Sequence, residues 1–375
     1  MQQTAEQIGW GTGYVRSISP YVGGKPIAEV AREFGLDPER IVKLASNENP
    51  LGMSPKAREA IFAALAETPR YPDNDGFALK QALARRLGVP AGWITLGHGS
   101  SDVLEMAARA LLTDADAGLY SRYSFIVYTQ AVQGVGARHQ VVADLDYGHD
   151  LDAMLRAITP QTRLIFVANP NNPTGSFIEG DALHRFLREV PARVAVVLDE
   201  AYVDYIEPGL RYDSMEWVRE FPNLIVSRTF SKAYGLAGLR IGYGVAQPAL
   251  TDVLNRVRSA FNTSTVGQAA ALAALDDQEF LDRSYAVNRA GYAQLTAAFA
   301  ALGLRHLPSQ GNFVLVRVGD DDGAGARVNL ALLQRGVIAR PVDNYGLPQW
   351  LRISIGTEAE NAVCIAALQA HLSGN

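Results

Sequence analysis

The sequence of 375 residues has one cysteine, no long apolar run and no excess of basic residues. The lone thiol, Cys364, lies in an apolar stretch and has no second cysteine with which to form an internal disulfide. A buried thiol in a reducing compartment is therefore expected. No run approaches the roughly 20 apolar residues of a membrane-spanning helix, so no membrane partner is expected. The net charge of −5 gives no basic field, which argues against nucleic acid as a partner.

Signals for secretion and for metal binding are also lacking. The first residues carry neither the basic start nor the apolar segment of a secretory signal, so a cytoplasmic location is expected. The six histidines are scattered, without an HExxH motif or cysteine pairs, and no metal site is predicted. What is present is a globular composition, 48% hydrophobic, in a chain long enough for two domains with ample cores.

The stretch Ser227–Arg240 carries the clearest chemical signal, and it follows a short apolar run typical of a buried strand. Lys232 stands there among small and hydroxylated residues, and partial burial would lower its pKa and leave an amine able to attack a carbonyl. Thr229 and Ser231 can donate hydroxyl hydrogen bonds to an anion, and the fork of Arg240 suits phosphate. Together these groups predict pyridoxal phosphate held as a Schiff base. The alternative is an exposed lysine in an ordinary strand-to-helix turn.

Two further polar segments follow apolar runs of the continuous kind expected in a parallel sheet. Leu164–Ala168 leads into Asn169–Gly175, where Asn172 could hydrogen-bond a phenolate-type oxygen without adding charge. Ala195–Leu198 leads into Asp199, and a carboxylate at the C-terminal end of such a strand lies where open α/β sheets bind ligands. Facing a pyridine nitrogen, it would keep that nitrogen protonated and the ring able to accept electrons. A simple helix cap at Asp199 is the alternative.

Other polar side chains are weaker candidates. Ser100 and Ser101 lie in a glycine-rich turn that opens a helix, where backbone N–H groups favour an anion, although many α/β turns look alike. Tyr202 could donate to the ring oxygen of the cofactor. Arg352 lies in the apolar strand Leu351–Ile355 and alternates with its apolar neighbours, so its side chain points to the opposite face. There its guanidinium requires a carboxylate or phosphate partner. That partner could be a substrate or a carboxylate of the protein itself, in an internal ion pair.

The pattern S/T-x-S-K followed by L-x-G-x-R around Lys232 resembles the cofactor-lysine motif of fold-type-I aminotransferases, and NPNNPTG around Asn172 supports the resemblance. With landmarks from Ser46 to Gly356, most of the chain resembles the histidinol-phosphate aminotransferase group. The resemblance implies an α/β fold of the fold-type-I pyridoxal-phosphate transferases. A large domain, residues 46–262, would hold a mainly parallel sheet flanked by helices. A smaller α/β domain would combine residues 263–375 with an N-terminal arm, residues 1–45.

The same resemblance implies roles that chemistry alone does not assign. Tyr71 would reach the cofactor phosphate of a neighbouring subunit, in a homodimer with shared active sites. Tyr123 would stack on the cofactor ring, although the sequence departs from the expected pattern because no proline precedes this tyrosine. Arg352 would bind the acidic group of the substrate. Arg340, and Tyr21 in the arm, are further candidates for the same anion.

The expected activity is amino transfer between L-histidinol phosphate and 2-oxoglutarate in histidine biosynthesis. Lys232 would anchor the cofactor and move protons, and Asp199 would stabilise the electron sink. The other cofactor contacts would come from Asn172, Tyr202, Ser100, Ser101, Tyr123, Thr229, Ser231, Arg240 and Tyr71. Because the two substrates carry phosphate and carboxylate, one pocket must accept both anions, which an arginine fork can do.

Three alternatives stay open from the sequence. One is an aminotransferase of the same group that acts on phenylalanine or tyrosine. Another is a lyase or decarboxylase that uses the same cofactor. The third is a binding protein that keeps the fold without turnover, against which the set Asn172, Asp199, Tyr202, Lys232, Arg240 and Arg352 argues. A helix from Pro248 to about Ser259 is expected to bridge the two domains.

Overall fold

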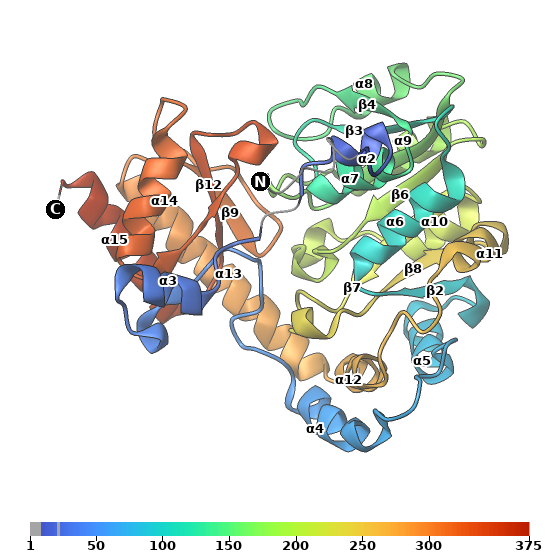
Figure 1. Ribbon diagram of the computed structural model, residues 1–375, viewed down its shortest axis with the longest axis horizontal. Helices are drawn as coiled ribbons and strands as arrows, with labels where there is room; N and C mark the ends of the chain where they lie inside the picture. The colour runs from blue at the N-terminus through green and yellow to red at the C-terminus, as the bar shows by residue number, and fades with distance from the viewer. Residues whose placement is uncertain (1–8, 21–22, 375) are drawn as a thin grey trace.

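A computed structural model describes residues 9–20 and 23–374 (Figure 1). Its larger part is built on a seven-stranded sheet with the order β2-β8-β7-β6-β5-β3-β4. The strands are β2 (Ile94–Gly97), β3 (Ala117–Ser121), β4 (Arg138–Val142), β5 (Thr162–Ala168), β6 (Ala195–Asp199), β7 (Leu224–Thr229) and β8 (Gly242–Ala246). All neighbours pair in parallel except β8, which is antiparallel to both β2 and β7.

The central strands are buried on both faces, which explains their continuous apolar runs. In β5, Leu164 and Phe166 pack on one side of the sheet, and Ile165 and Val167 pack on the other. Helices covering the first side are α6 (Ser100–Leu111), α7 (Ile126–Gly134) and α11 (Pro248–Val257). Helices packed into the core of the second side are α4 (Pro55–Ala64), α5 (Phe77–Leu87), α8 (Leu151–Arg156), α9 (Gly180–Glu189), α10 (Ser214–Glu220) and α12 (Thr265–Leu275).

The smaller part combines both ends of the chain. Its antiparallel sheet has the order β11-β12-β9, formed by β11 (Arg340–Pro341), β12 (Trp350–Ser354) and β9 (Phe313–Arg317). A second, two-stranded sheet pairs β1 (Val42–Lys43) in parallel with β10 (Val337–Ile338), which ties the N-terminal segment to the C-terminal one. The helices are α3 (Ile27–Phe34), α13 (Gln278–Ala301), α14 (Ala324–Gln334) and α15 (Glu358–Leu372), while the short α2 (Gly13–Arg16) lies against α7.

The prediction that the helix from Pro248 to about Ser259 bridges the two domains is wrong. The helix found there, α11, packs Leu254 into the core of the seven-stranded sheet beside α6. The element that contacts both parts is the 24-residue α13, which touches β9 and α15 at one side and the turn Val203–Tyr205 of the larger part at the other. Figure 1 shows α13 running from α12 to the smaller sheet. Within the described residues, no helix is both long and apolar enough to cross a membrane.

Candidate active site

A cavity of about 410 Å³ lies where side chains from the two parts meet. Because β5, β6 and β7 are parallel, their carboxyl ends lie at the same edge of the sheet. From this edge come Asn172, Asp199, Tyr202 and Lys232, and from the smaller sheet come Arg340 and Arg352. The remaining lining includes Ser46, Asn47, Glu48, Ser100, Ser101, Phe125, Gln130, Thr229, Ser231, Arg240 and Tyr345. Sequence-predicted candidates far apart in the chain therefore meet around one cavity.

Asp199 is the last residue of β6 and is buried. Strand alternation puts it on the same side of the sheet as Ala195 and Val197, the side that α7 covers. From α7 the hydroxyl of Tyr128 donates to Oδ2 of Asp199 at 2.8 Å, and the backbone N–H of Ala201 donates to Oδ1 at 3.2 Å. Burial raises the pKa of Asp199 to about 6, and the two hydrogen bonds oppose that rise.

Lys232 lies three residues after β7, and its side chain is only partly exposed. Its Nζ donates to the carbonyl of Ser46 at 3.3 Å and lies 5.7 Å from the centre of the Tyr202 ring. The pKa of Lys232 is lowered to about 8, mainly by burial and also by the guanidiniums of Arg352 and Arg240, while the carboxylates of Glu48 and Asp199 oppose this shift. An amine with this pKa is partly neutral near neutral pH and can act as a nucleophile or a base.

Tyr202 and Asn172 lie near Lys232 with their polar groups held by neighbours. The Tyr202 hydroxyl accepts a hydrogen bond from Nδ2 of Asn47 at 2.9 Å, and burial raises the pKa of Tyr202 to about 12, so it stays a neutral phenol. The Asn172 side-chain oxygen accepts from Nη1 of Arg352 at 2.6 Å. Asn47 is held in the left-handed region, at φ 54°, where asparagine is tolerated better than most residues.

An anion site forms at one end of the cavity. Ser100 and Ser101 begin α6, whose first turn presents backbone N–H groups. Arg240 donates to Oγ of Ser231 at 3.3 Å and to the carbonyl of Ala237 at 3.0 Å. A Cβ on Gly99 would lie 2.5 Å from Nη2 of Arg240, and its φ of 78° also favours glycine, so this close approach requires it. With Thr229, these side chains bring hydroxyls and one cation to the same cavity, a combination that can bind an anion.

Two buried arginines form the other polar end. Arg340 of β11 and Arg352 of β12 are direct partners in the antiparallel ladder, and both line the cavity. Arg352 also donates through Nη2 to the carbonyl of Ala45 at 2.8 Å, and its guanidinium lies 5.4 Å from the centre of the Phe313 ring. Such a pair favours a substrate that carries negative charge.

Two sequence candidates, Tyr123 and Tyr71, do not line this cavity, and a third, Tyr21, cannot be placed. Tyr123 is in the turn between β3 and α7, and its ring stacks on Tyr147 with the ring centres 5.7 Å apart. The aromatic side chain that lines the cavity is Phe125, two residues later. Tyr71 is 82% exposed and stacks on Phe261 instead of reaching the cavity of its own chain. Tyr21 lies outside the described residues.

Sequence reasoning missed Phe125, Tyr128 and Asn47 as site residues. The missing proline before Tyr123 was a usable signal that the family's aromatic position lies elsewhere. Asn47 could not be found from the sequence because its contact with Tyr202 spans 155 positions. The hydrogen bond from Tyr128 to Asp199 spans 71 positions and depends on the placement of α7. The start of this helix has no capping side chain from which the sequence could predict it.

A sheet of this kind, with a lysine, a carboxylate and two arginines around one cavity, is the arrangement that an aminotransferase requires. The chain belongs to the family of class I and II aminotransferases, whose family model matches residues 39–368. The predicted enzyme class is therefore confirmed, as is the predicted fold class of a mainly parallel sheet flanked by helices with a smaller α/β part.

Within this family, the chain is similar to proteins named histidinol-phosphate aminotransferase, which confirms the resemblance drawn from the sequence. The one from Ralstonia nicotianae is 65% identical over 364 residues, covering 97% of each chain. The one from Cupriavidus pinatubonensis is 63% identical, covering 98% of this chain and 97% of the relative. The solved enzyme from Sinorhizobium meliloti in complex with pyridoxal-5'-phosphate superposes with a TM-score of 0.88 at 30% identity, covering 97% of this chain and 98% of that chain.

Proposed function

We propose that this enzyme transfers an amino group between L-histidinol phosphate and 2-oxoglutarate with pyridoxal phosphate as cofactor. The observation that carries the proposal is the cavity itself. Lys232, with its lowered pKa, lies in one cavity with Asp199 and with two buried arginines, Arg340 and Arg352. The names of the close relatives support the choice of donor over phenylalanine or tyrosine.

The donor set of the cavity fits pyridoxal phosphate. Ser100, Ser101, Thr229, Ser231 and Arg240 would hold the phosphate, beside the close approach that Gly99 permits. Asn172 and Tyr202 would hold the ring oxygen, and Asp199 would face the ring nitrogen. We assign the ring face to Phe125 instead of Tyr123, because Phe125 lines the cavity and Tyr123 stacks on Tyr147.

When bound, pyridoxal phosphate supplies an aldehyde carbon and a ring that accepts electrons. Lys232 would anchor the cofactor at that carbon, and its Nζ would move the proton from the amine-bearing carbon of the substrate. A pKa of about 8 leaves Nζ able both to take and to return this proton near neutral pH. Asp199 must be ionised to pair with a protonated ring nitrogen, and the hydrogen bond from Tyr128 favours the ionised form.

Arg352 and Arg340 would bind the acidic end of each substrate in turn. Phosphate and carboxylate can each take two parallel hydrogen bonds from a guanidinium, so one pair of arginines can serve both substrates. Because a phosphate monoester carries more charge than a carboxylate, it should depend more on the second arginine. Arg340 is therefore the residue that we expect to favour histidinol phosphate.

The proposal includes a homodimer with shared active sites, in which Tyr71 binds the phosphate of the partner's cofactor. Its support is the exposure of Tyr71, together with that of two other aromatic side chains, Phe62 of α4 and Phe77 of α5. The division into an arm (1–45), a large domain (46–262) and a small domain (263–375) also stays a proposal, which the pairing of β1 with β10 supports. So does a cytoplasmic location, with which the buried free thiol of Cys364 agrees.

A single half-reaction tests the activity. Purified enzyme loaded with pyridoxal phosphate is mixed with L-histidinol phosphate alone, and the cofactor is followed by absorbance and identified after release. We expect stoichiometric conversion to pyridoxamine phosphate, which 2-oxoglutarate then reverses. Release of carbon dioxide or ammonia with the cofactor unchanged would indicate a lyase or decarboxylase instead, and no change with any amine would indicate a binding protein.

A further inference from the structure

Phe261 has an unusual backbone for its residue type. It lies in the loop between α11 and α12 with a φ of 56°, in the left-handed region that bulky side chains rarely adopt. Such strain persists only where the surroundings hold it, and it gathers at functional sites. The side chain is 42% exposed, so burial in a core does not explain it. Its ring instead stacks on Tyr71, with the ring centres 4.5 Å apart and the planes 20° from parallel.

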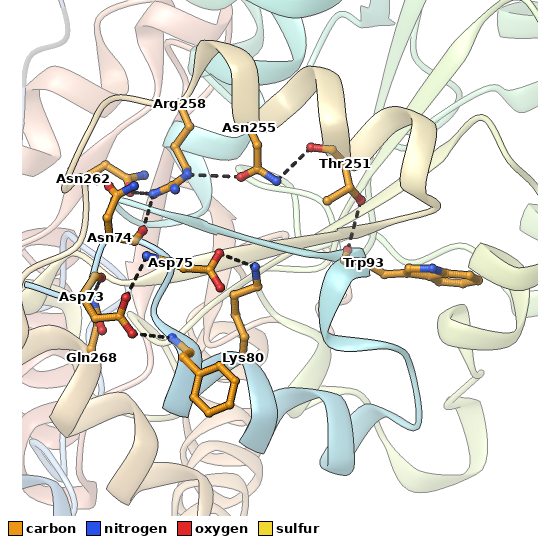
Figure 2. Close-up of polar contacts among 11 residues, drawn as sticks. Asp73, Asn74, Asp75, Lys80, Trp93, Thr251, Asn255, Arg258, Asn262 and Gln268 are labelled. Atoms are coloured by element: carbon orange, nitrogen blue, oxygen red, sulfur yellow. Dashed lines mark hydrogen bonds and ion pairs between the residues drawn. The ribbon is translucent and has the colours of Figure 1, made fainter.

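A set of polar contacts holds the strained loop against the loop that carries Tyr71. The backbone N–H of Phe261 donates to Oδ1 of Asn74 at 2.7 Å. Arg258 donates through Nη1 to the carbonyl of Asn74 and to Oδ1 of Asn262, both at 2.9 Å, and through Nε to Oδ1 of Asn255 at 3.2 Å. Figure 2 shows Arg258 reaching between these asparagines. The backbone on both sides of the aromatic pair is therefore fixed.

The loop of Tyr71 is also fixed to the helix that follows it. Asp73 accepts from the backbone N–H groups of Asp75 at 3.0 Å and Phe77 at 2.8 Å, and so holds the start of α5. Gln268 of α12 donates to the carbonyl of Asp73 at 2.8 Å. These contacts hold the backbone at Asp73, two residues after Tyr71, and within the described residues the ring that stacks on Tyr71 is Phe261. The direction of the Tyr71 side chain therefore depends on Phe261.

We propose that Phe261 is a positioning residue that holds Tyr71 for the phosphate of the cofactor bound to the partner subunit. This inference rests on the shared active site proposed above. The Tyr71 ring is 82% exposed, and an exposed tyrosine side chain samples several rotamers. A stacked ring restricts them at little cost, so the hydroxyl is already in place when the cofactor binds. Backbone strain at Phe261 is the expected cost of that preorganisation.

The test compares two ligands that differ only in the phosphate. Apoenzyme variants are titrated with pyridoxal phosphate and with pyridoxal, and dissociation constants are read from absorbance and protein fluorescence. Tyr71→Phe should weaken pyridoxal phosphate about tenfold or more, because a hydrogen bond to a charged group is lost. Phe261→Leu should weaken it about threefold to tenfold, and Phe261→Tyr, which keeps the ring, should restore wild-type affinity. Pyridoxal affinity should change by less than about twofold in each case.

A double variant and a substitution at Asn74 test whether Phe261 acts through Tyr71. Tyr71→Phe combined with Phe261→Leu should bind no more weakly than Tyr71→Phe alone, since the ring acts only through that hydroxyl. Asn74→Ala leaves both rings intact but removes the acceptor of the Phe261 N–H, and it should cause a smaller, phosphate-selective loss. Leu330→Ala, at an exposed apolar residue on α14 of the smaller part, should leave both affinities unchanged.

Failure of this inference can be told apart from failure of the shared site. If Phe261→Leu and Asn74→Ala leave the affinity for pyridoxal phosphate within twofold while Tyr71→Phe lowers it, Phe261 does not position Tyr71. Equal losses for both ligands would overturn the inference in the same way. If Tyr71→Phe itself has no effect, the shared site fails. Mixing inactive Tyr71 and Lys232 variants tests that site separately, because a two-fold dimer should regain about a quarter of its sites.

Discussion

The two sheets contribute to one cavity in different ways. The seven-stranded sheet provides Asp199 and Lys232, and burial moves the pKa of the first up to about 6 and that of the second down to about 8. Both groups can therefore change protonation near neutral pH. The three-stranded sheet provides Arg340 and Arg352, whose guanidiniums stay charged in proteins. Under the proposed function, residues of one sheet transfer protons and residues of the other recognise the anions of the substrates.

Removing the amine of Lys232 should give the largest loss of activity. Lys232→Ala should fold but lose the visible absorbance of the lysine-bound cofactor and lower turnover by about 10⁴-fold or more, since both anchor and base are lost. Lys56→Ala, on the surface of α4, is the matched control and should keep full activity. Borohydride reduction followed by peptide mass spectrometry locates the linkage. A cofactor adduct on another lysine of the variant would show that Lys232 is not the anchor.

Replacing the carboxylate should give the next largest effect. Asp199→Asn should still bind the cofactor but slow proton removal by about 10²-fold or more, because a neutral amide cannot stabilise a protonated ring nitrogen. Rapid-mixing measurement of the half-reaction reports this rate, and Asp150→Asn, at the cap of α8, serves as control. A rate within about tenfold of wild type, or about 1.4 kcal/mol in barrier, would remove Asp199 from this role.

The sequence was most informative where polar functional residues directly follow an apolar run. The runs at 164–168 and 195–198 became β5 and β6, and the polar residues after them came together as expected from parallel strands. Lys232 and Arg240, close together in one stretch, meet at the same cavity. In these segments the local sequence predicts where the functional residues lie, because residues that directly follow a buried parallel strand are placed at the carboxyl edge of the sheet.

Other parts of the site depend on contacts that one sequence does not encode locally. The missing proline before Tyr123 signalled a departure from the family pattern, but the sequence alone did not show that Phe125, two residues later, lines the cavity instead. The register that sets Arg340 opposite Arg352 depends on pairing of two strands separated by a loop. The helix expected to bridge the two parts was misplaced, because amphipathic periodicity shows that a helix packs but not on what it packs.

Substitution at the smaller sheet should change specificity more than chemistry. Arg340→Gln should lower kcat/KM for histidinol phosphate about tenfold to a hundredfold, and for phenylalanine less than about threefold, since a charged hydrogen bond to phosphate is lost. Arg317→Gln, on β9 beside Asp320, is the control. Equal losses for both donors would mean that Arg340 supports the pocket without recognising phosphate, and the division between the two sheets would fail.

The smallest effect is expected at Tyr128. Tyr128→Phe keeps the ring that stacks on Phe166 but removes the hydrogen bond that favours ionised Asp199. The pKa of Asp199 should rise, so the acidic limb of the pH profile of kcat/KM should move up by about half a unit to one unit. Tyr120→Phe, another buried tyrosine whose hydroxyl contacts His139, is the control. An unchanged acidic limb would show that Tyr128 only packs against the sheet.

The central claim, a lysine-centred transfer site joined to an anion site for a phosphorylated donor, is tested most directly with the wild-type enzyme. The measurement is kcat/KM for L-histidinol phosphate, L-phenylalanine and L-tyrosine, each with 2-oxoglutarate as acceptor. We expect the highest value for histidinol phosphate, because this donor alone places a phosphate against Arg340 and Arg352. A higher value for phenylalanine or tyrosine would contradict it and identify an aromatic amino-acid aminotransferase.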